Sequence, residues 1–332
     1  MKDRMTNRER FRAVFSFETP DRLPRIEWAP WWDKTLRRWE DEGMPRGLDA
    51  LESQRYFGLD PMLCIASDPI GPGAPAARGQ GLGLIDDEAG YEALLPVLYT
   101  DARIDSLLDA ARRLKPLHDS GEVVIRLWLD GFFWFPRRLL GIERHLYSFY
   151  DRPELLHRIC DDAAAYHLRV LDRLFDVLVP DMVGFAEDMS YNLGPMLSEE
   201  MFDEFLCPRY RRIVPVLREA GSFVLADSDG DVTRMVPWLL RAGIQGVYPL
   251  ERQAGVDVAA LRAAYPEFLM LGAFDKMTMF RSADAMRAEF ARLRPTALTG
   301  GFIPSVDHQT PPEVSLENYR EYLRQFAAFS EL

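Results

Sequence analysis

From about residue 120 onward, short apolar segments alternate with longer amphipathic segments. The apolar segments have the length of buried strands and span 123–129, 182–186, 223–226, 246–248, 268–271 and 298–303. In the longer segments apolar residues recur at three- and four-residue steps, which predicts helices over 153–179, 198–220, 232–242, 256–264, 283–293 and 315–329. Repeated strand–helix units of this kind build parallel sheets covered by helices.

The N-terminal third adds two predicted strands, 23–28 and 61–66, separated by helical segments rich in Trp and charge. Together the segments make eight strands, the number that closes a parallel (β/α)8 or TIM barrel. A chain of 332 residues fits one such domain with an N-terminal helical extension. No repeat or linker is visible, so we expect residues 1–332 to form a single domain. The Gly- and Pro-rich stretch 69–90 is predicted as a loop that serves as a lid.

The composition limits the classes of molecule that this protein is expected to bind. Lys and Arg number 40 against 52 Asp and Glu, a net charge of −12 with no basic stripe, which disfavours nucleic acid and anionic membranes. No signal peptide or membrane-length apolar run occurs, so a cytoplasmic protein is expected. Cys64, Cys160 and Cys207 lack paired spacing, which argues against disulfides and a thiolate zinc site. The expected partner is a small molecule or another protein, and the sequence leaves a homodimer open.

The segment Asp227-Ser-Asp-Gly-Asp231 follows an apolar strand and leads into a predicted helix. Side chains alternate along a strand, so Asp227 and Asp229 should point the same way. Two converging carboxylates repel unless a cation or a shared proton lies between them. Helix capping is the alternative interpretation, because Asp is common at helix starts.

Acidic residues follow nearly every predicted strand. They are Glu27, Asp68, Asp130, Glu187, Asp188, Asp227, Asp229, Glu251, Asp275 and Asp307. Strand ends of a parallel barrel meet at one face, where catalytic residues lie. Adjacent acids such as Glu187 and Asp188 cannot both face the barrel axis, so part of this set must be structural.

Among the five histidines, His308 alone follows a predicted strand, the last one. A neutral imidazole beside carboxylates suits Zn²⁺ or another divalent metal. The predicted metal ligands are therefore Asp227, Asp229, Glu187 and His308. Alternatively, His308 acts as a general acid or contacts an anion.

Tryptophans crowd the segment after the first predicted strand. Trp28, Trp31 and Trp32 are candidates to wall a pocket for a flat or methylated substrate, with core packing as the alternative. Glu27 and Asp275 are further candidates for substrate contact.

Several longer motifs resemble those of the uroporphyrinogen decarboxylase superfamily, which includes methyltransferases that load or unload corrinoid proteins. The motifs are Met5-Thr-Asn-Arg-Glu-Arg-Phe11, Pro20-Asp-Arg-Leu-Pro24, Gly194-Pro-Met-Leu-Ser-Glu-Glu-Met-Phe202, the Asp227–Asp231 turn, Tyr248-Pro-Leu-Glu251, and Gly300-Gly-Phe-Ile-Pro304 with His308. The resemblance covers nearly the whole chain and implies the same (β/α)8 barrel.

Resemblance to the corrinoid methyltransferases aligns Asp227 and Asp229 with a His-x-Cys zinc pair and the Asp307–His308 region with the last zinc cysteine. Oxygen and nitrogen here replace sulfur, which puts thiol methylation in doubt. Resemblance to the decarboxylases aligns Asp68 and His308 with residues that hold the tetrapyrrole. Their arginine-rich anchor is replaced by Glu27-Trp-Ala-Pro-Trp-Trp-Asp-Lys34, which argues against uroporphyrinogen as substrate.

The leading hypothesis is a metal-dependent methyltransferase that moves a methyl group from a small O- or N-methylated compound to a corrinoid protein. Zinc would activate the leaving atom, Glu251 would support the metal ligands or donate a proton, and Lys276 with Asp275 would orient the substrate or a loop. The first alternative is a decarboxylase of a small carboxylated substrate in which Asp68 and His308 guide protonation. The second is a non-catalytic barrel that binds a corrinoid protein or a small ligand.

Overall fold

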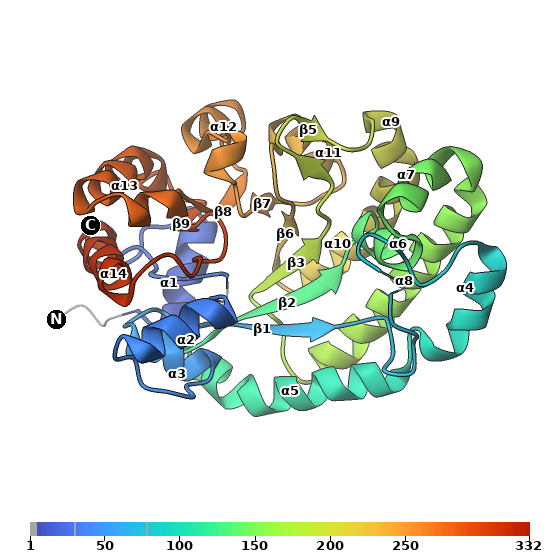
Figure 1. Cartoon of the computed structure of the whole chain (residues 1–332), viewed down its shortest axis with the longest axis horizontal. Helices are drawn as coiled ribbons and strands as arrows, with labels where there is room; N and C mark the ends of the chain where they lie inside the picture. Colours follow the sequence, from blue (N-terminus) through green and yellow to red (C-terminus); the bar gives the residue numbers. More distant parts are fainter. Residues whose placement is uncertain (1–4, 30, 78) are drawn as a thin grey trace.

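The computed structural model describes residues 5–29, 31–77 and 79–332. Seven parallel strands form one curled sheet in the order β1-β2-β3-β6-β7-β8-β9 (Figure 1). The strands are β1 (Met62–Ser67), β2 (Val124–Asp130), β3 (Met182–Ala186), β6 (Phe223–Asp227), β7 (Gly246–Tyr248), β8 (Leu269–Phe274) and β9 (Phe302–Val306), and a small hairpin of β4 (Ser190–Tyr191) and β5 (Gly194–Pro195) follows β3. The order confirms the α/β class and a TIM-barrel-like arrangement.

Helices cover the outside of the sheet, with α5 running along β1 (Figure 1). Their bounds are α1 (Asn7–Phe15), α2 (Asp33–Asp41), α3 (Ala50–Tyr56), α4 (Glu88–Leu94), α5 (Asp101–Asp119), α6 (Trp134–Leu140), α7 (Ile142–Asp151), α8 (Pro153–Phe175), α9 (Glu199–Met201), α10 (Cys207–Glu219), α11 (Val236–Arg241), α12 (Val258–Ala264), α13 (Ala283–Ala297) and α14 (Leu316–Ser330). A π-helical turn, Phe202–Leu206, joins α9 to α10. Among the described helices, none is long and apolar enough to cross a membrane.

The eighth predicted strand, residues 23–28, does not form, so the barrel is not closed and that prediction is wrong. The segment is extended and connects the two open edges of the sheet. Near β1, the Asp60 amide donates to the Arg25 carbonyl at 2.8 Å. Near β9, the Trp28 indole donates to the Val306 carbonyl at 2.7 Å. A regular ladder is missing because Pro24 has no N–H to donate and the Trp28 amide bonds the Ser305 hydroxyl instead.

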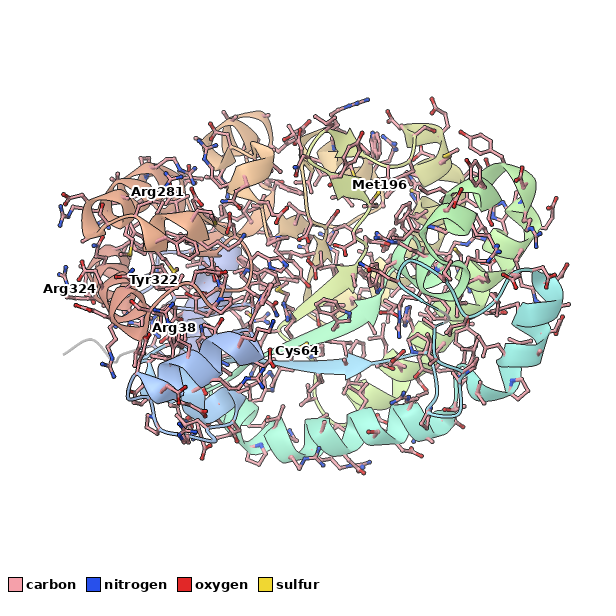
Figure 2. All side chains as sticks on the ribbon, in the orientation of Figure 1. Arg38, Cys64, Met196, Arg281, Tyr322 and Arg324 are labelled. Carbon is pink, nitrogen blue, oxygen red and sulfur yellow. The ribbon has the colours of Figure 1, made fainter. Side chains whose placement is uncertain are left out.

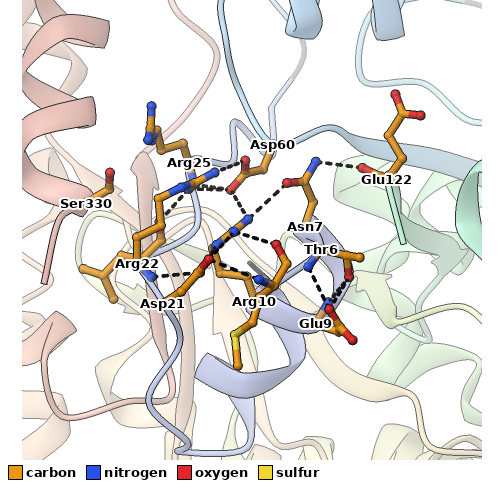
Figure 3. Close-up of polar contacts among 12 residues, drawn as sticks. Thr6, Asn7, Glu9, Arg10, Asp21, Arg22, Arg25, Asp60, Glu122 and Ser330 are labelled. Atoms are coloured by element: carbon orange, nitrogen blue, oxygen red, sulfur yellow. Dashed lines mark hydrogen bonds and ion pairs between the residues drawn. The ribbon is translucent and has the colours of Figure 1, made fainter. Parts of the chain in front are cut away.

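The N-terminal motif anchors this segment (Figure 3). Thr6 and Glu9 form a capping box at the start of α1. On α1, the buried Arg10 guanidinium bonds both oxygens of Asp21 at 2.7 and 3.0 Å. Arg22 donates to both oxygens of the buried Asp60 at 2.8 and 2.5 Å. The motif that supports the family resemblance is therefore structural.

The predicted loop after β1 packs against α6 and α7. The amides of Leu84 and Ile85 both donate to the Leu139 carbonyl, at 2.6 and 3.0 Å. At Gly83 an added Cβ would lie 2.2 Å from the same carbonyl oxygen, so the close approach requires glycine. Residue 78 of this loop lies outside the described chain.

Candidate active site

A cavity of about 840 Å³ lies between β1 and the unpaired segment before α2. Side chains from the strands form its inner end, and the helices α2 and α3 cover one side. The residues that line it include Glu27, Trp28, Trp31, Cys64, Ala66, Arg126, Trp128, Trp134, Asp188, Asp227, Asp229 and His308. Its volume is within the range of about 300–1,000 Å³ typical of small-molecule sites. The missing eighth strand thus helps to make room for a ligand.

Three predicted site residues meet at this cavity: Asp227, Asp229 and His308. The imidazole Nε2 of His308 lies 3.8 Å from Oδ2 of Asp229, a distance that a small rotamer change would convert to a hydrogen bond. Asp227, at the end of β6, is almost fully buried. Asp188 also lines the cavity, and its backbone φ of 42° is in the strained left-handed region.

The acids at the cavity hold protons more tightly than usual. Burial raises the pKa of Asp229 to about 7, and Asp188 and Glu251 add to the shift while Lys276 opposes it. Burial also raises the pKa of Asp227 well above its ordinary value, although Arg126 opposes this shift. Burial and Lys276 together lower the pKa of His308, so its imidazole is neutral at pH 7. Near pH 7 the Asp229–His308 pair therefore combines a carboxyl group that carries a proton part of the time with a neutral base.

Glu187, a predicted metal ligand, holds backbone groups instead. Its carboxylate accepts the amides of Phe132, Phe133 and Trp134 at 2.9, 2.7 and 3.1 Å, and the Tyr210 hydroxyl. These amides start α6, where unpaired N–H groups attract a carboxylate. Glu187 is fully buried and does not line the cavity.

Glu251, Lys276 and Asp275 lie near the mouth without lining the cavity. Glu251 accepts the Gly230 amide at 2.9 Å and so supports the turn that carries Asp229. The Lys276 ammonium donates to the buried Asp307 at 3.1 Å. Asp275 caps the 3₁₀ turn Lys276–Phe280 through the Met277 amide. Glu251, Lys276 and Asp275 therefore hold the loops at the cavity mouth in place.

The predicted aromatic residues divide into two groups. Trp28 and Trp31 line the cavity, whereas Trp32 is 42% exposed and does not. The Trp31 indole bonds the Tyr319 hydroxyl at 3.0 Å. Glu27 lines the cavity but accepts the hydroxyl of Tyr322 on α14 at 2.5 Å (Figure 2), and burial raises its pKa to about 7.

Asp68 belongs to a different cavity, of about 500 Å³, under the 69–90 loop. There it pairs with Arg138 at 3.0 Å, and Arg138 also pairs with Asp130. Asp68 is absent from the lining of the larger cavity, so the structure does not bring it together with His308 in one cavity.

The cavity supplies fewer donor groups than a resident metal ion needs. Zinc in proteins takes a tetrahedral set of ligands, with three or more supplied by the chain. Within residues 5–29, 31–77 and 79–332, no three His, Cys, Asp or Glu side chains converge to hold an ion. Asp229 and His308 supply two donor atoms for a metal. The Glu187 carboxylate is not available as a ligand because it accepts amides at the start of α6. This arrangement does not fit a zinc site held by the protein.

Sequence reasoning missed Arg126, Trp128 and Tyr248. Arg126 is 4% exposed in the middle of β2, and Arg126 and Trp128 both line the cavity. The sequence does contain a signal for Arg126, because a charged residue inside the apolar run Val123–Leu129 is unusual in a buried strand. Tyr248 was expected as the last residue of its strand, but its contact with Arg126 requires the tertiary structure.

The arrangement of helices around a curled parallel sheet, with polar groups at the strand ends, defines a barrel-type α/β protein. The uroporphyrinogen decarboxylase (URO-D) model matches residues 85–328, and the chain belongs to this family. No curated protein sequence matches the chain significantly.

Among solved structures, a methyltransferase from Methanosarcina mazei is 15% identical, with a TM-score of 0.72, and the match covers 98% of this chain and 99% of that one. A B12-independent methionine synthase from Shewanella sp. W3-18-1 is 12% identical, with a TM-score of 0.50, covering 93% and 92% of the two chains. At these identities the similarity shows the fold alone.

Proposed function

We propose that this protein is a methyltransferase that moves a methyl group from a small O- or N-methylated compound to a corrinoid carried by a partner protein. The observation that carries the proposal is the Asp229–His308 pair at a cavity walled by Trp28, Trp31, Trp128 and Trp134. The aromatic walls suit a flat substrate, and the pair suits a group that must leave with a proton. The URO-D family and the methyltransferase fold of the M. mazei protein are consistent with this chemistry.

In the proposed reaction the acceptor supplies an electron pair to the methyl carbon, and the bond from that carbon to oxygen or nitrogen breaks. The leaving atom keeps the bonding pair and takes a proton. Asp229 donates this proton, because its raised pKa keeps part of it protonated near pH 7. His308, neutral and 3.8 Å away, relays a proton from solvent to the resulting Asp229 carboxylate, taking up one proton on one ring nitrogen as it releases another from Nε2. No step passes through a metal, because the donor set does not fit one.

Uroporphyrinogen fits this cavity poorly. Its many carboxylates would meet Glu27, Asp49, Asp188, Asp227 and Asp229, whereas Arg126 is the one Arg or Lys among the described lining residues. Porphyrinogen turnover is therefore expected to be negligible.

The test is incubation with a reduced corrinoid protein and a panel of methoxylated aromatic compounds and methylamines. A change of the corrinoid absorbance on methylation supports the proposal, and Asp229→Asn should abolish it. Carbon dioxide release from a carboxylated compound without corrinoid methylation would favour the decarboxylase instead.

A further inference from the structure

Arg126 is a buried cation without an ion pair in the described chain, although Cys64, Tyr248 and Asp227 lie near enough to stabilise its charge. Its Nε and Nη1 make no hydrogen bond, and no described carboxylate lies within 4.0 Å of it. Arg209, which is 6% exposed, shows the usual arrangement: it donates to both oxygens of Asp161 at 3.0 and 2.7 Å. A buried charge without an ion pair is unusual, so its presence calls for a function.

Aromatic rings surround the Arg126 guanidinium. Its Cζ lies 5.6 Å from the Trp28 ring, 5.5 Å from the Trp128 ring and 5.4 Å from the Tyr248 ring. These cation–π contacts offset part of the cost of burial. Nε and Nη1 are buried away from the cavity surface, so the remaining nitrogen, Nη2, is the one left to meet a ligand in the cavity that Arg126 lines.

Small residues leave space beside this cation. In the sheet register, Cys64 lies opposite Arg126, and Ala66 and Gly184 lie on either side of Trp128. Barrel interiors are ordinarily filled by bulky branched side chains. Here Cys64, in the first half of β1 (Figure 2), and Ala66 line the cavity instead of filling it. At Gly184 an added Cβ would lie 2.0 Å from the Tyr248 hydroxyl, so glycine lets Tyr248 reach the Arg126 region.

Trp28 connects the two ends of the cavity. Its ring lies 5.6 Å from Cζ of Arg126 and 6.3 Å, centroid to centroid, from the His308 ring. The guanidinium and His308, the partner of Asp229, therefore both lie next to the same aromatic ring. A ligand that reaches both needs an anionic end, a flat middle and a reactive opposite end.

We propose that Arg126 binds the carboxylate of a methylated single-ring aromatic acid, whose ring packs against Trp28 and Trp128. Nη2 donates to the carboxylate, and a small rotation of the guanidinium would add a second, parallel N–H bond. The opposite end of the ring then places the methylated oxygen or nitrogen at Asp229 and His308. The position of the methyl group rests on the proposed function, whereas the carboxylate site does not.

Calorimetric binding of 4-methoxybenzoate and the neutral 4-methoxybenzyl alcohol tests the carboxylate site. The acid should bind about 10- to 100-fold more tightly than the alcohol, as expected for hydrogen bonds to a charged group. Arg126→Met should remove this preference, and Arg126→Lys should keep part of it. Equal affinities of the wild-type protein for the two ligands would overturn the proposal.

Thermal stability gives an independent readout. Arg126→Met removes a buried charge that has no ion pair and should leave the Tm close to the wild-type value. The control Arg209→Met breaks the ion pair with Asp161 and should lower the Tm without changing the preference for the acid. A lower Tm for Arg126→Met together with an unchanged preference for the acid would show a structural role and overturn the proposal. Arg126→Lys provides the binding comparison if Arg126→Met does not fold.

Failure of this proposal is distinguishable from failure of the proposed function. Binding of the acid that depends on Arg126, without corrinoid methylation, would overturn the methyltransferase alone. Methylation from the neutral alcohol as fast as from the acid would overturn the carboxylate site alone. Release of carbon dioxide from the bound acid would overturn both, because the carboxylate would then be the reacting group.

Discussion

Nε2 of His308 and Oδ2 of Asp229 lie 3.8 Å apart, although Asp229 follows β6 and His308 follows β9. Each strand end brings one of the two side chains to the same cavity. A carboxyl group with a raised pKa beside a neutral imidazole is suited to proton transfer.

Asp229→Asn should lower kcat/KM for methyl transfer by at least about 100-fold, because the amide cannot donate an acidic proton. In the wild-type protein Asp229 acts in its protonated form, and its pKa is raised to about 7. Activity should therefore fall as the pH rises through about 7 and stay high below it. The pH profile of kcat/KM measures this decrease, and the residual activity of Asp229→Asn should not show it.

Asp231→Asn is the matched control in the same turn. Asp231 accepts the Thr233 amide at 3.0 Å and does not line the cavity. The Asp231→Asn variant should retain near wild-type activity and the same pH profile. An equal loss in both variants would point to collapse of the turn instead of a lost proton donor.

Glu27→Gln should weaken the pH dependence of stability. Burial raises the pKa of Glu27 from 4.5 to about 7, so between these values the native state binds more protons than the unfolded state. The free energy of unfolding therefore falls as pH rises through this window, by on the order of 3 kcal/mol. Urea unfolding at pH 5 and pH 8 should show a smaller difference for the variant. An identical difference in both proteins would contradict the assignment to Glu27.

Glu187→Ala should lower the free energy of unfolding by at least about 3 kcal/mol, because it leaves buried amides at the start of α6 without a hydrogen-bond acceptor. Glu187→Gln retains an acceptor oxygen and should lose less. Denaturant unfolding of the two variants measures the difference. A stable alanine variant would mean that the amides find other partners.

Metal analysis should find no stoichiometric zinc in the purified protein, and chelators should leave methyl transfer unchanged, because Asp229 and His308 alone supply too few ligands. Elemental analysis after dialysis is the measurement. One equivalent of zinc that disappears in Asp229→Ala/His308→Ala would show that the site closes around an ion, and would restore the metal-dependent reaction.

Much of the fold could be predicted because burial patterns are local. The strands β2, β3, β6, β7 and β8 lie within a few residues of their predicted ranges. The last strand begins at Phe302 because α13 continues to Ala297 and turns before it. The segment 23–28 has the apolar content of a strand, but a strand also needs ladder partners, and its hydrogen bonds go elsewhere.

The sequence by itself determined the barrel-like class and the meeting of Asp227, Asp229 and His308, because the ends of parallel strands converge whatever their side chains. Only the tertiary structure decided that Glu187 holds α6, that Asp68 pairs with Arg138 in a second cavity, and that Arg126 is buried without an ion pair in the described chain. These roles depend on which groups from distant segments come within hydrogen-bonding distance. A carboxylate or guanidinium looks the same in the sequence whether or not a partner reaches it.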